Sequence, residues 1–144
     1  MIGREALFSR NSDEYETPQS LFDQLNEEFH FNLDPCSTDE NCKCDRHFTK
    51  ETDGLKVSWG GWNVFCNPPY SKISQWVCKC YEESLKPNTM CVMLIPSRTD
   101  TKWFHNYIYH RAEIRFIKGR LKFGGEKNNA PFPSMIVIFR SAKM

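Results

Sequence analysis

Hydrophobic side chains recur at helical spacing in three stretches of the chain. In each stretch they lie three or four positions apart, which places them on one face of a helix. The spacing predicts a helix from Pro18 to about Phe29, a second helix after Ser71 and a third from about Asp100 to Tyr109. The inward residues would be Leu21, Phe22, Leu25 and Phe29 in the first, Ile73, Trp76, Val77, Cys80 and Tyr81 in the second, and Trp103, Phe104, Tyr107 and Ile108 in the third.

Shorter apolar runs predict strands between these helices. They cover residues 31–33, 62–66, 90–95, 113–117 and 135–139. The run Met90–Ile95 has no polar residue, which is typical of a strand that is covered on both faces and therefore of a parallel sheet. Strands that alternate with helices predict an α/β fold with a mostly parallel central sheet flanked by helices.

Length and composition narrow the class of protein. The 144 residues predict one domain, and residues 1–14 lack periodicity and are expected to form a loose arm ahead of it. The 14% aromatic content is too high for a disordered chain. No apolar run approaches ~18 residues, and the first ten residues lack the apolar core of a secretory signal, so we expect no membrane partner and a cytoplasmic location. A net charge of +1 excludes a strongly basic nucleic-acid binder but allows a local basic patch.

The seven cysteines leave two interpretations open. In a cytoplasmic protein they are expected to stay reduced. Cys36, Cys42 and Cys44, with Cys78 and Cys80, form a cluster that could bind zinc, but each tight pair has one intervening residue where zinc sites usually have two to four. We therefore expect no metal site.

The segment Asn67-Pro68-Pro69-Tyr70 carries the chemistry that the sequence suggests most clearly. It follows a predicted buried strand and precedes a helix, which is where open α/β sheets bind ligands. The two prolines fix the backbone and remove two N–H donors. The Asn67 side-chain oxygen and the Pro68 carbonyl could then accept the two N–H groups of an exocyclic amine, while the Tyr70 ring offers a flat face to a planar group. A simpler interpretation is a strand end with Tyr70 in the core.

An ordered set of motifs resembles the phage-type DNA N-6-adenine methyltransferase family, which depends on S-adenosylmethionine. The motifs run from residue 15 to about 139. They are Tyr15-Glu16-Thr17-Pro18, Leu33-Asp34-Pro35-Cys36, Asp53-Gly54-Leu55, Trp59, Phe65 to Tyr70, Leu94-Ile95-Pro96, Trp103-Phe104, Gly119 to Phe123 and Ala130-Pro131-Phe132. The tetrapeptide at 67–70 alone is less specific, because glutamine-directed protein methyltransferases share it.

The resemblance implies roles for individual residues. Asn67, Pro68, Pro69 and Tyr70 would be catalytic. S-adenosylmethionine would be held by Thr17 and Pro18 at its methionine end, by Asp34, Pro35 and Cys36 after the first strand, and by Asp53 near its adenine. Each of these segments also has a structural interpretation, as a helix cap, an Asp-Pro turn and an Asp-Gly turn. The usual glycine-rich cofactor loop is absent, and the short spacing from Asp34 to Asn67 predicts a trimmed Rossmann-like methyltransferase fold.

The resemblance further implies DNA as the partner, with a short or relaxed recognition site. The target adenine would be flipped out of the duplex. Lys72, Arg98 and Arg120 are the cations that we expect at the phosphates, where they would position DNA without reading its sequence. Two alternatives remain: a methyltransferase acting on another amine, such as a glutamine side chain or an RNA base, and a non-enzymatic or zinc-binding module. A role in restriction and modification of phage or bacterial DNA follows only from the family.

Overall fold

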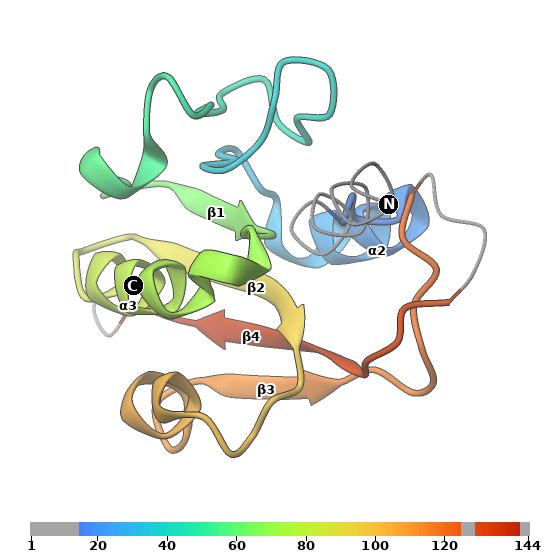
Figure 1. Ribbon diagram of the computed structural model, residues 1–144. Coiled ribbons are helices and arrows are strands. Elements are labelled where there is room, and N and C mark those ends of the chain that lie inside the picture. Colours follow the sequence, from blue (N-terminus) through green and yellow to red (C-terminus); the bar gives the residue numbers. More distant parts are fainter. Residues whose placement is uncertain (1–14, 125–128, 142–144) are drawn as a thin grey trace, which may run out of the picture.

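The computed structural model describes residues 15–124 and 129–141. The expected arm over residues 1–14 lies outside this part of the chain. The described elements, in chain order, are α2 (Gln19–Phe29), the 3-10 helix η1 (Gly54–Lys56), β1 (Asn63–Cys66), the 3-10 helix η2 (Tyr70–Lys72), α3 (Ile73–Ser84), β2 (Met90–Pro96), the π-helix η3 (Phe104–Ile108), β3 (Glu113–Phe116) and β4 (Ser134–Phe139) (Figure 1).

The four strands form one sheet in the order β1-β2-β4-β3. Only β1 and β2 pair in parallel, and β4 pairs antiparallel with both β2 and β3. The α/β class is confirmed, but the prediction of a mostly parallel sheet is wrong. The reason is that β4 returns from β3 and inserts between β3 and β2, and the described residues of the connection contain no covering helix.

Helices cover both faces of this sheet, which explains the continuous apolar strands. Side chains of α3 and η3 pack on one face, together with Val64, Cys66, Cys91, Met93 and Val137. Side chains of α2 pack on the other face, together with Phe65, Val92, Leu94, Ile136 and Ile138. Every residue of β2 and β4 is therefore buried. An apolar run reports that a strand is covered on both faces, and it does not report the strand's direction.

Two predicted elements are shorter than expected. The third helix is reduced to η3, where the Tyr109 N–H donates to the Phe104 carbonyl, although Trp103, Phe104 and Ile108 are buried as expected. The strand predicted over 31–33 is reduced to parallel bridges, one from Leu33 to Val64 and one from Asp34 to His47. The remaining helices and strands lie within about two residues of their predicted bounds. In the described part of the chain, no helix combines the length and apolar character needed to cross a membrane.

The strand directions bring three connections to one edge of the sheet. Because β3 runs antiparallel to β4, and β4 antiparallel to β2, the strands β1, β2 and β3 all point the same way. Their carboxyl ends therefore lie at the same edge. Asn67 follows β1, Arg98 follows β2 and Arg120 follows β3 there. The predicted catalytic segment and two of the predicted DNA-binding cations thus share this edge.

Candidate active site

The segment 67–70 leaves β1 as a rigid loop whose carbonyls have distinct partners. The Asn67 carbonyl accepts from the Cys36 thiol at 3.3 Å, and the Pro69 carbonyl accepts from the Lys72 N–H at 3.1 Å. Among the described residues, the Pro68 carbonyl accepts from no group. Pro68 itself is buried, and the pocket described below is lined by its neighbours Asn67 and Pro69. The predicted role of the Pro68 carbonyl as an acceptor stays a prediction.

The Asn67 carboxamide is held by the segment that precedes α2. Its Nδ2 donates both hydrogens, one to the Tyr15 carbonyl and one to the Thr17 hydroxyl at 3.0 Å. The Oδ1 atom accepts from no group in the described chain, and the side chain borders a pocket. Both N–H groups are committed to protein acceptors, so the side chain can offer only an acceptor to a ligand. Asn67 Oδ1 and the Pro68 carbonyl are thus the two unoccupied acceptors of the loop.

Tyr70 belongs to an aromatic cluster rather than standing alone. Its ring stacks on Tyr15 with centroids 5.4 Å apart, and Phe132 meets both rings edge-on. Phe123 packs against Tyr15 and Phe132. Burial raises the pKa of the Tyr70 hydroxyl, Tyr15 adds to this effect and Arg98 opposes it. The flat surface expected of Tyr70 is present, but Tyr15 covers one of its faces.

A pocket of about 730 Å³ opens beside Asn67 and Pro69. This volume lies in the range of small-molecule sites. The segments that line it are 15–17, 34–41, 49–51 and 53–55, together with Lys43, Phe65, Ser71, Lys72 and Trp76. Of the residues predicted to hold the cofactor, Thr17, Asp34, Pro35, Cys36 and Asp53 line the pocket, whereas Pro18 does not. The predicted residues therefore converge on one cavity, and their contacts with a cofactor stay a prediction.

Asp34 and Cys36 connect the pocket wall to the catalytic loop. Asp34 is buried, and its carboxylate accepts from the backbone N–H of Lys43 at 2.9 Å and of Cys36 at 3.4 Å. Burial raises the pKa of Asp34 even though these hydrogen bonds favour the charged form. Burial also raises the pKa of the Cys36 thiol well above its usual value, so Cys36 remains a thiol that donates to Asn67. The primary role of Asp34 visible here is to fold the loop over 36–43.

The Asp53-Gly54 turn also lines the pocket and packs against Pro35. Asp53 adopts a left-handed conformation with φ of 60°, and its side chain accepts from the Leu55 N–H. A Cβ at Gly54 would lie 2.1 Å from the Pro35 carbonyl oxygen. Only glycine allows this approach of the two backbones. Nearby, Trp76 lines the pocket, and its Nε1 is buried without an acceptor among the described residues.

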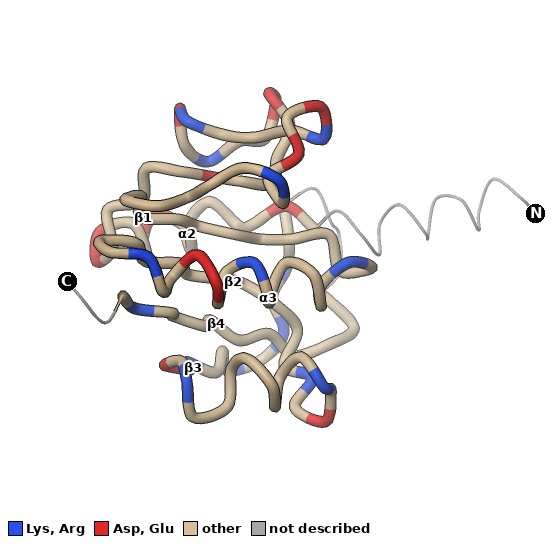
Figure 2. The backbone as a smooth tube through the Cα atoms, turned by 90° about the vertical axis from the view of Figure 1, so that its left-hand side faces the viewer, with Lys and Arg blue, Asp and Glu red and all other residues tan. Residues whose placement is uncertain are grey.

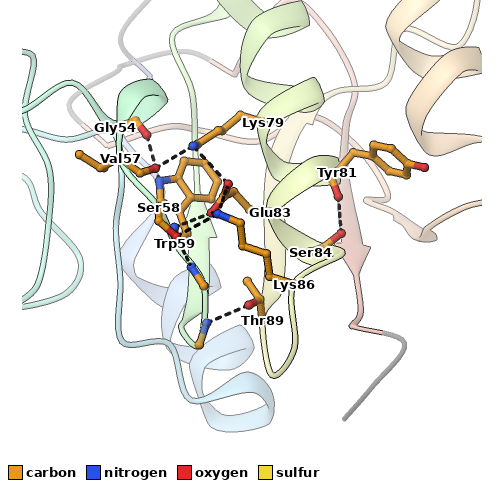
Figure 3. Close-up of polar contacts among 12 residues, drawn as sticks. Gly54, Val57, Ser58, Trp59, Lys79, Tyr81, Glu83, Ser84, Lys86 and Thr89 are labelled. Atoms are coloured by element: carbon orange, nitrogen blue, oxygen red, sulfur yellow. Dashed lines mark hydrogen bonds and ion pairs between the residues drawn. The ribbon is translucent and has the colours of Figure 1, made fainter.

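A buried carboxylate on α3 supports this wall from behind (Figure 3). Glu83 accepts from the Trp59 backbone N–H and pairs with Lys79 at 3.3 Å and Lys86 at 2.8 Å. The Trp59 indole N–H then donates to the Gly54 carbonyl at 3.0 Å. This chain of contacts fixes the position of the Asp53-Gly54 turn. No sequence pattern predicted these contacts of Glu83 and Trp59, because Glu83 has the appearance of an ordinary exposed helical residue.

The predicted DNA-binding cations have no ion-pair partner within the described residues, as is also true of several other Lys and Arg side chains. Lys72, Arg98 and Arg120 are exposed and form no salt bridge within the described residues. By contrast, Arg115 pairs with Glu28 and Glu113 on the outside of the sheet. The loop between α2 and β1 carries both signs of charge (Figure 2). Positive charge that is left unneutralised is thus found at the carboxyl edge of the sheet, beside the catalytic loop.

Two contacts at the site have no counterpart in the predictions. Thr17 was expected either to cap a helix or to bind the cofactor. α2 begins at Gln19 with no side-chain cap, and the Thr17 hydroxyl contacts Asn67, while its contact with a cofactor stays a prediction. Tyr15 was noted only as part of a motif, and it contacts both Asn67 and Tyr70. These contacts join residues about 50 positions apart, for which no local pattern exists.

Comparison with known proteins relates the whole chain to a family of enzymes. The sequence model of the family DNA N-6-adenine-methyltransferase (Dam) matches residues 5–144. The DNA N-6-adenine-methyltransferase of Haemophilus phage HP1 (strain HP1c1) is 31% identical over 147 residues, which cover 96% of this chain and 85% of that protein. The enzyme of the same description from Escherichia phage T1 is 32% identical over 111 residues, 76% of this chain and 46% of that one. A solved structure from Thermoplasma acidophilum described as a methyltransferase aligns with a TM-score of 0.36 and 12% identity over 73% of this chain and 50% of that one.

Proposed function

Because the chain belongs to the DNA N-6-adenine-methyltransferase (Dam) family, we propose that it transfers a methyl group from S-adenosylmethionine to the N6 amine of a flipped adenine in DNA. The single observation that carries the proposal is the pair of unoccupied acceptors, Asn67 Oδ1 and the Pro68 carbonyl, on a loop that borders a ligand-sized pocket. Residues 15–144 would act as one methyltransferase domain, in the cytoplasm of a bacterium or a phage-infected host.

The two acceptors would activate the amine by hydrogen bonding. An exocyclic amine of adenine delocalises its lone pair into the ring, which makes it a weak nucleophile. Hydrogen bonds from its two N–H groups to Asn67 Oδ1 and the Pro68 carbonyl would localise the lone pair on nitrogen and stabilise the positive charge that develops there. A strong base is unnecessary, because the nitrogen loses its proton readily once it carries the methyl group. Positioning of the two reactants would lower the activation free energy further, and such effects reach about 7–11 kcal/mol in favourable cases.

The pocket fits the methyl donor in size and in the groups that it offers. S-adenosylmethionine supplies a methyl group on a positively charged sulfur when bound. Asp34 and Asp53 line the pocket with carboxylates for its cationic groups, and Trp76 offers a buried N–H without a protein acceptor. Thr17, Pro35 and Cys36 complete the wall nearest the catalytic loop, and Pro18 would act only by directing the chain into α2.

The aromatic cluster would receive the flipped adenine. Flipping costs a few kcal/mol of stacking and pairing. Packing a base on an aromatic ring returns roughly 1–3 kcal/mol. Tyr70 and Phe132 provide this surface beside Asn67. Lys72, Arg98 and Arg120 would hold the phosphates at the same edge, which favours DNA over a glutamine side chain as the substrate.

Methyl transfer to unmethylated plasmid DNA tests the proposal directly. The protein is incubated with plasmid and S-adenosylmethionine labelled in its methyl group, and the DNA is digested to nucleosides. We expect the label in N6-methyladenine with the wild type and none with Asn67→Ala. Asn106→Ala serves as the matched control, because Asn106 is an exposed residue of η3 away from the pocket. Label on cytosine, RNA or protein, or full activity in Asn67→Ala, would overturn the proposal.

A further inference from the structure

The segment Tyr15–Thr17 forms a short strap across the catalytic loop. Its backbone is anchored at Glu16, whose carbonyl accepts from the Gly124 N–H at 2.9 Å. Thr17 is 4% exposed, and its hydroxyl lies 3.0 Å from Asn67 Nδ2. The Tyr15 carbonyl takes the second hydrogen of the same amide group. The strap therefore satisfies every donor that the Asn67 side chain possesses.

A carboxamide that lacks such contacts has two orientations, which exchange its oxygen and its NH₂ group. In one orientation Asn67 presents Oδ1 to the substrate, and in the other it presents two further donors. An amine substrate needs an acceptor at this position, so only the first orientation would activate it. The Tyr15 carbonyl can only accept, so a reversed Asn67 would set two acceptor oxygens against each other. The Tyr15 carbonyl thus selects the orientation that leaves Oδ1 available, and the Thr17 hydroxyl, which can donate or accept, holds the carboxamide in that place.

We propose that Thr17 is a positioning residue for methyl transfer, whose hydroxyl holds the Asn67 carboxamide in the orientation that the Tyr15 carbonyl selects, with its oxygen toward the target amine. This inference rests on the proposed function and assigns to Thr17 a role other than a cofactor contact or a helix cap. Thr17 acts through Asn67 and touches neither the amine nor the methyl group. Its contribution falls on the transfer step, after cofactor and DNA have bound.

The strap also reaches the other end of the tetrapeptide, through the stacking of Tyr15 on Tyr70. One three-residue segment thus contacts both the side chain that would activate the amine and the ring that would support the base. Removal of the Thr17 hydroxyl alone changes the contact with Asn67 and leaves the contact with Tyr70, because the contacts of Tyr15 depend on the Tyr15 ring and the Tyr15 backbone carbonyl. The Thr17 side chain is therefore the suitable point for a test.

The test compares Thr17→Ser, Thr17→Val and Thr17→Ala in the full chain. Serine keeps the hydroxyl, and valine keeps the shape of the side chain without the hydroxyl. Alanine also lacks the hydroxyl, so it shows whether an effect of valine comes from misfolding that only valine causes. Cofactor affinity is measured by titration with S-adenosylmethionine in the absence of DNA, and the transfer step by single turnover on duplex DNA at saturating cofactor. We expect Thr17→Ser to stay within about threefold of wild type. Loss of one buried hydrogen bond in the other two corresponds to a rate about 5- to 100-fold lower at an unchanged dissociation constant.

Thr89→Val is the control for general destabilisation. Thr89 is fully buried at the start of β2, and its hydroxyl donates to the Pro87 carbonyl and accepts from the Gly61 N–H, away from the pocket. We expect this variant to lower the unfolding midpoint without slowing single turnover. The inference is overturned if Thr17→Val and Thr17→Ala weaken cofactor binding but transfer at the wild-type rate when saturated, or if both match wild type throughout. If the wild type methylates an acceptor other than adenine, the proposed function fails, and the same series decides the role of Thr17 on that acceptor.

Discussion

Gly54→Ala tests whether the approach of two backbones forms the wall of the cofactor pocket. The added Cβ would lie 2.1 Å from the Pro35 carbonyl oxygen and 3.1 Å from the Trp76 ring. The atom that it meets first belongs to the backbone, so no side-chain rotation relieves the contact, and the Pro35 and Gly54 segments must separate by about 1 Å. Overpacking of this kind costs about 1–3 kcal/mol. The smaller entropy of the unfolded chain returns about 0.4–1 kcal/mol.

The net destabilisation is therefore about 0–2.6 kcal/mol, to be measured by urea unfolding followed through tryptophan fluorescence. Because Pro35 and Gly54 both line the pocket, we also expect the dissociation constant for S-adenosylmethionine to rise at least tenfold. Gly60→Ala is the matched control. Its Cβ would meet the flexible Lys86 side chain at 3.3 Å, so its stability should change by less than about 0.5 kcal/mol with unaltered cofactor binding. If both variants behave alike in both assays, the close approach does not shape the pocket.

Three further predictions concern the aromatic cluster, the DNA surface and the buried carboxylate. Tyr70→Phe removes a buried hydroxyl without a partner among the described residues, so the melting temperature should hold or rise and methyl transfer should persist. Tyr70→Ala should lower the single-turnover rate about 10- to 100-fold, because ~1–3 kcal/mol of stacking is lost. Arg98→Ala should weaken DNA binding for all sequences alike and lower the slope of log affinity against log salt by about 0.9. Glu83→Gln should destabilise by about 1–3 kcal/mol at pH 7. Burial raises the pKa of Glu83, but hydrogen bonds from Lys86 and Trp59 outweigh it and hold the pKa below its usual 4.5. The contribution of ionised Glu83 to the free energy of unfolding should therefore be full above pH 4.5 and vanish as the pH falls through the native pKa, which unfolding measured at a series of pH values would show.

The secondary structure followed from local pattern, and the sheet topology did not. The predicted helix over 18–29 and the strand over 90–95 match α2 and β2 closely, because periodicity and unbroken apolar runs report burial. Strand direction depends on where the chain goes next. The connection from β3 to β4 spans residues 117–133 and holds no helix among its described residues, so β4 lies antiparallel to β3. An observation that could have suggested this is the absence of any helical periodicity between Ile117 and Met135.

The candidate site likewise has a part that the local sequence predicts and a part that it does not. The segment 67–70 was identified because its chemistry is local: two prolines and an asparagine directly after a buried strand. The residues that support it are remote in sequence. Thr17 reaches Asn67 across 50 positions, and Glu83 reaches Trp59 across 24. Such contacts are fixed by the folded backbone, so single-sequence reasoning could name Thr17 as a site residue but not the group that it contacts.

The missing glycine-rich loop has a physical explanation in the structure. In dinucleotide sites, glycines after the first strand let the backbone approach a ligand closely. Here the segment after Leu33 contains Asp34, Pro35 and Cys36 without a glycine, and its carbonyl at Pro35 is instead approached by Gly54. The residue without a Cβ is here Gly54, in the neighbouring segment of the pocket wall, where it permits close contact between two protein segments. The pocket is therefore closed by packing between loops that are pinned through Trp59 and Glu83, and its shape should depend on residues that never touch the cofactor.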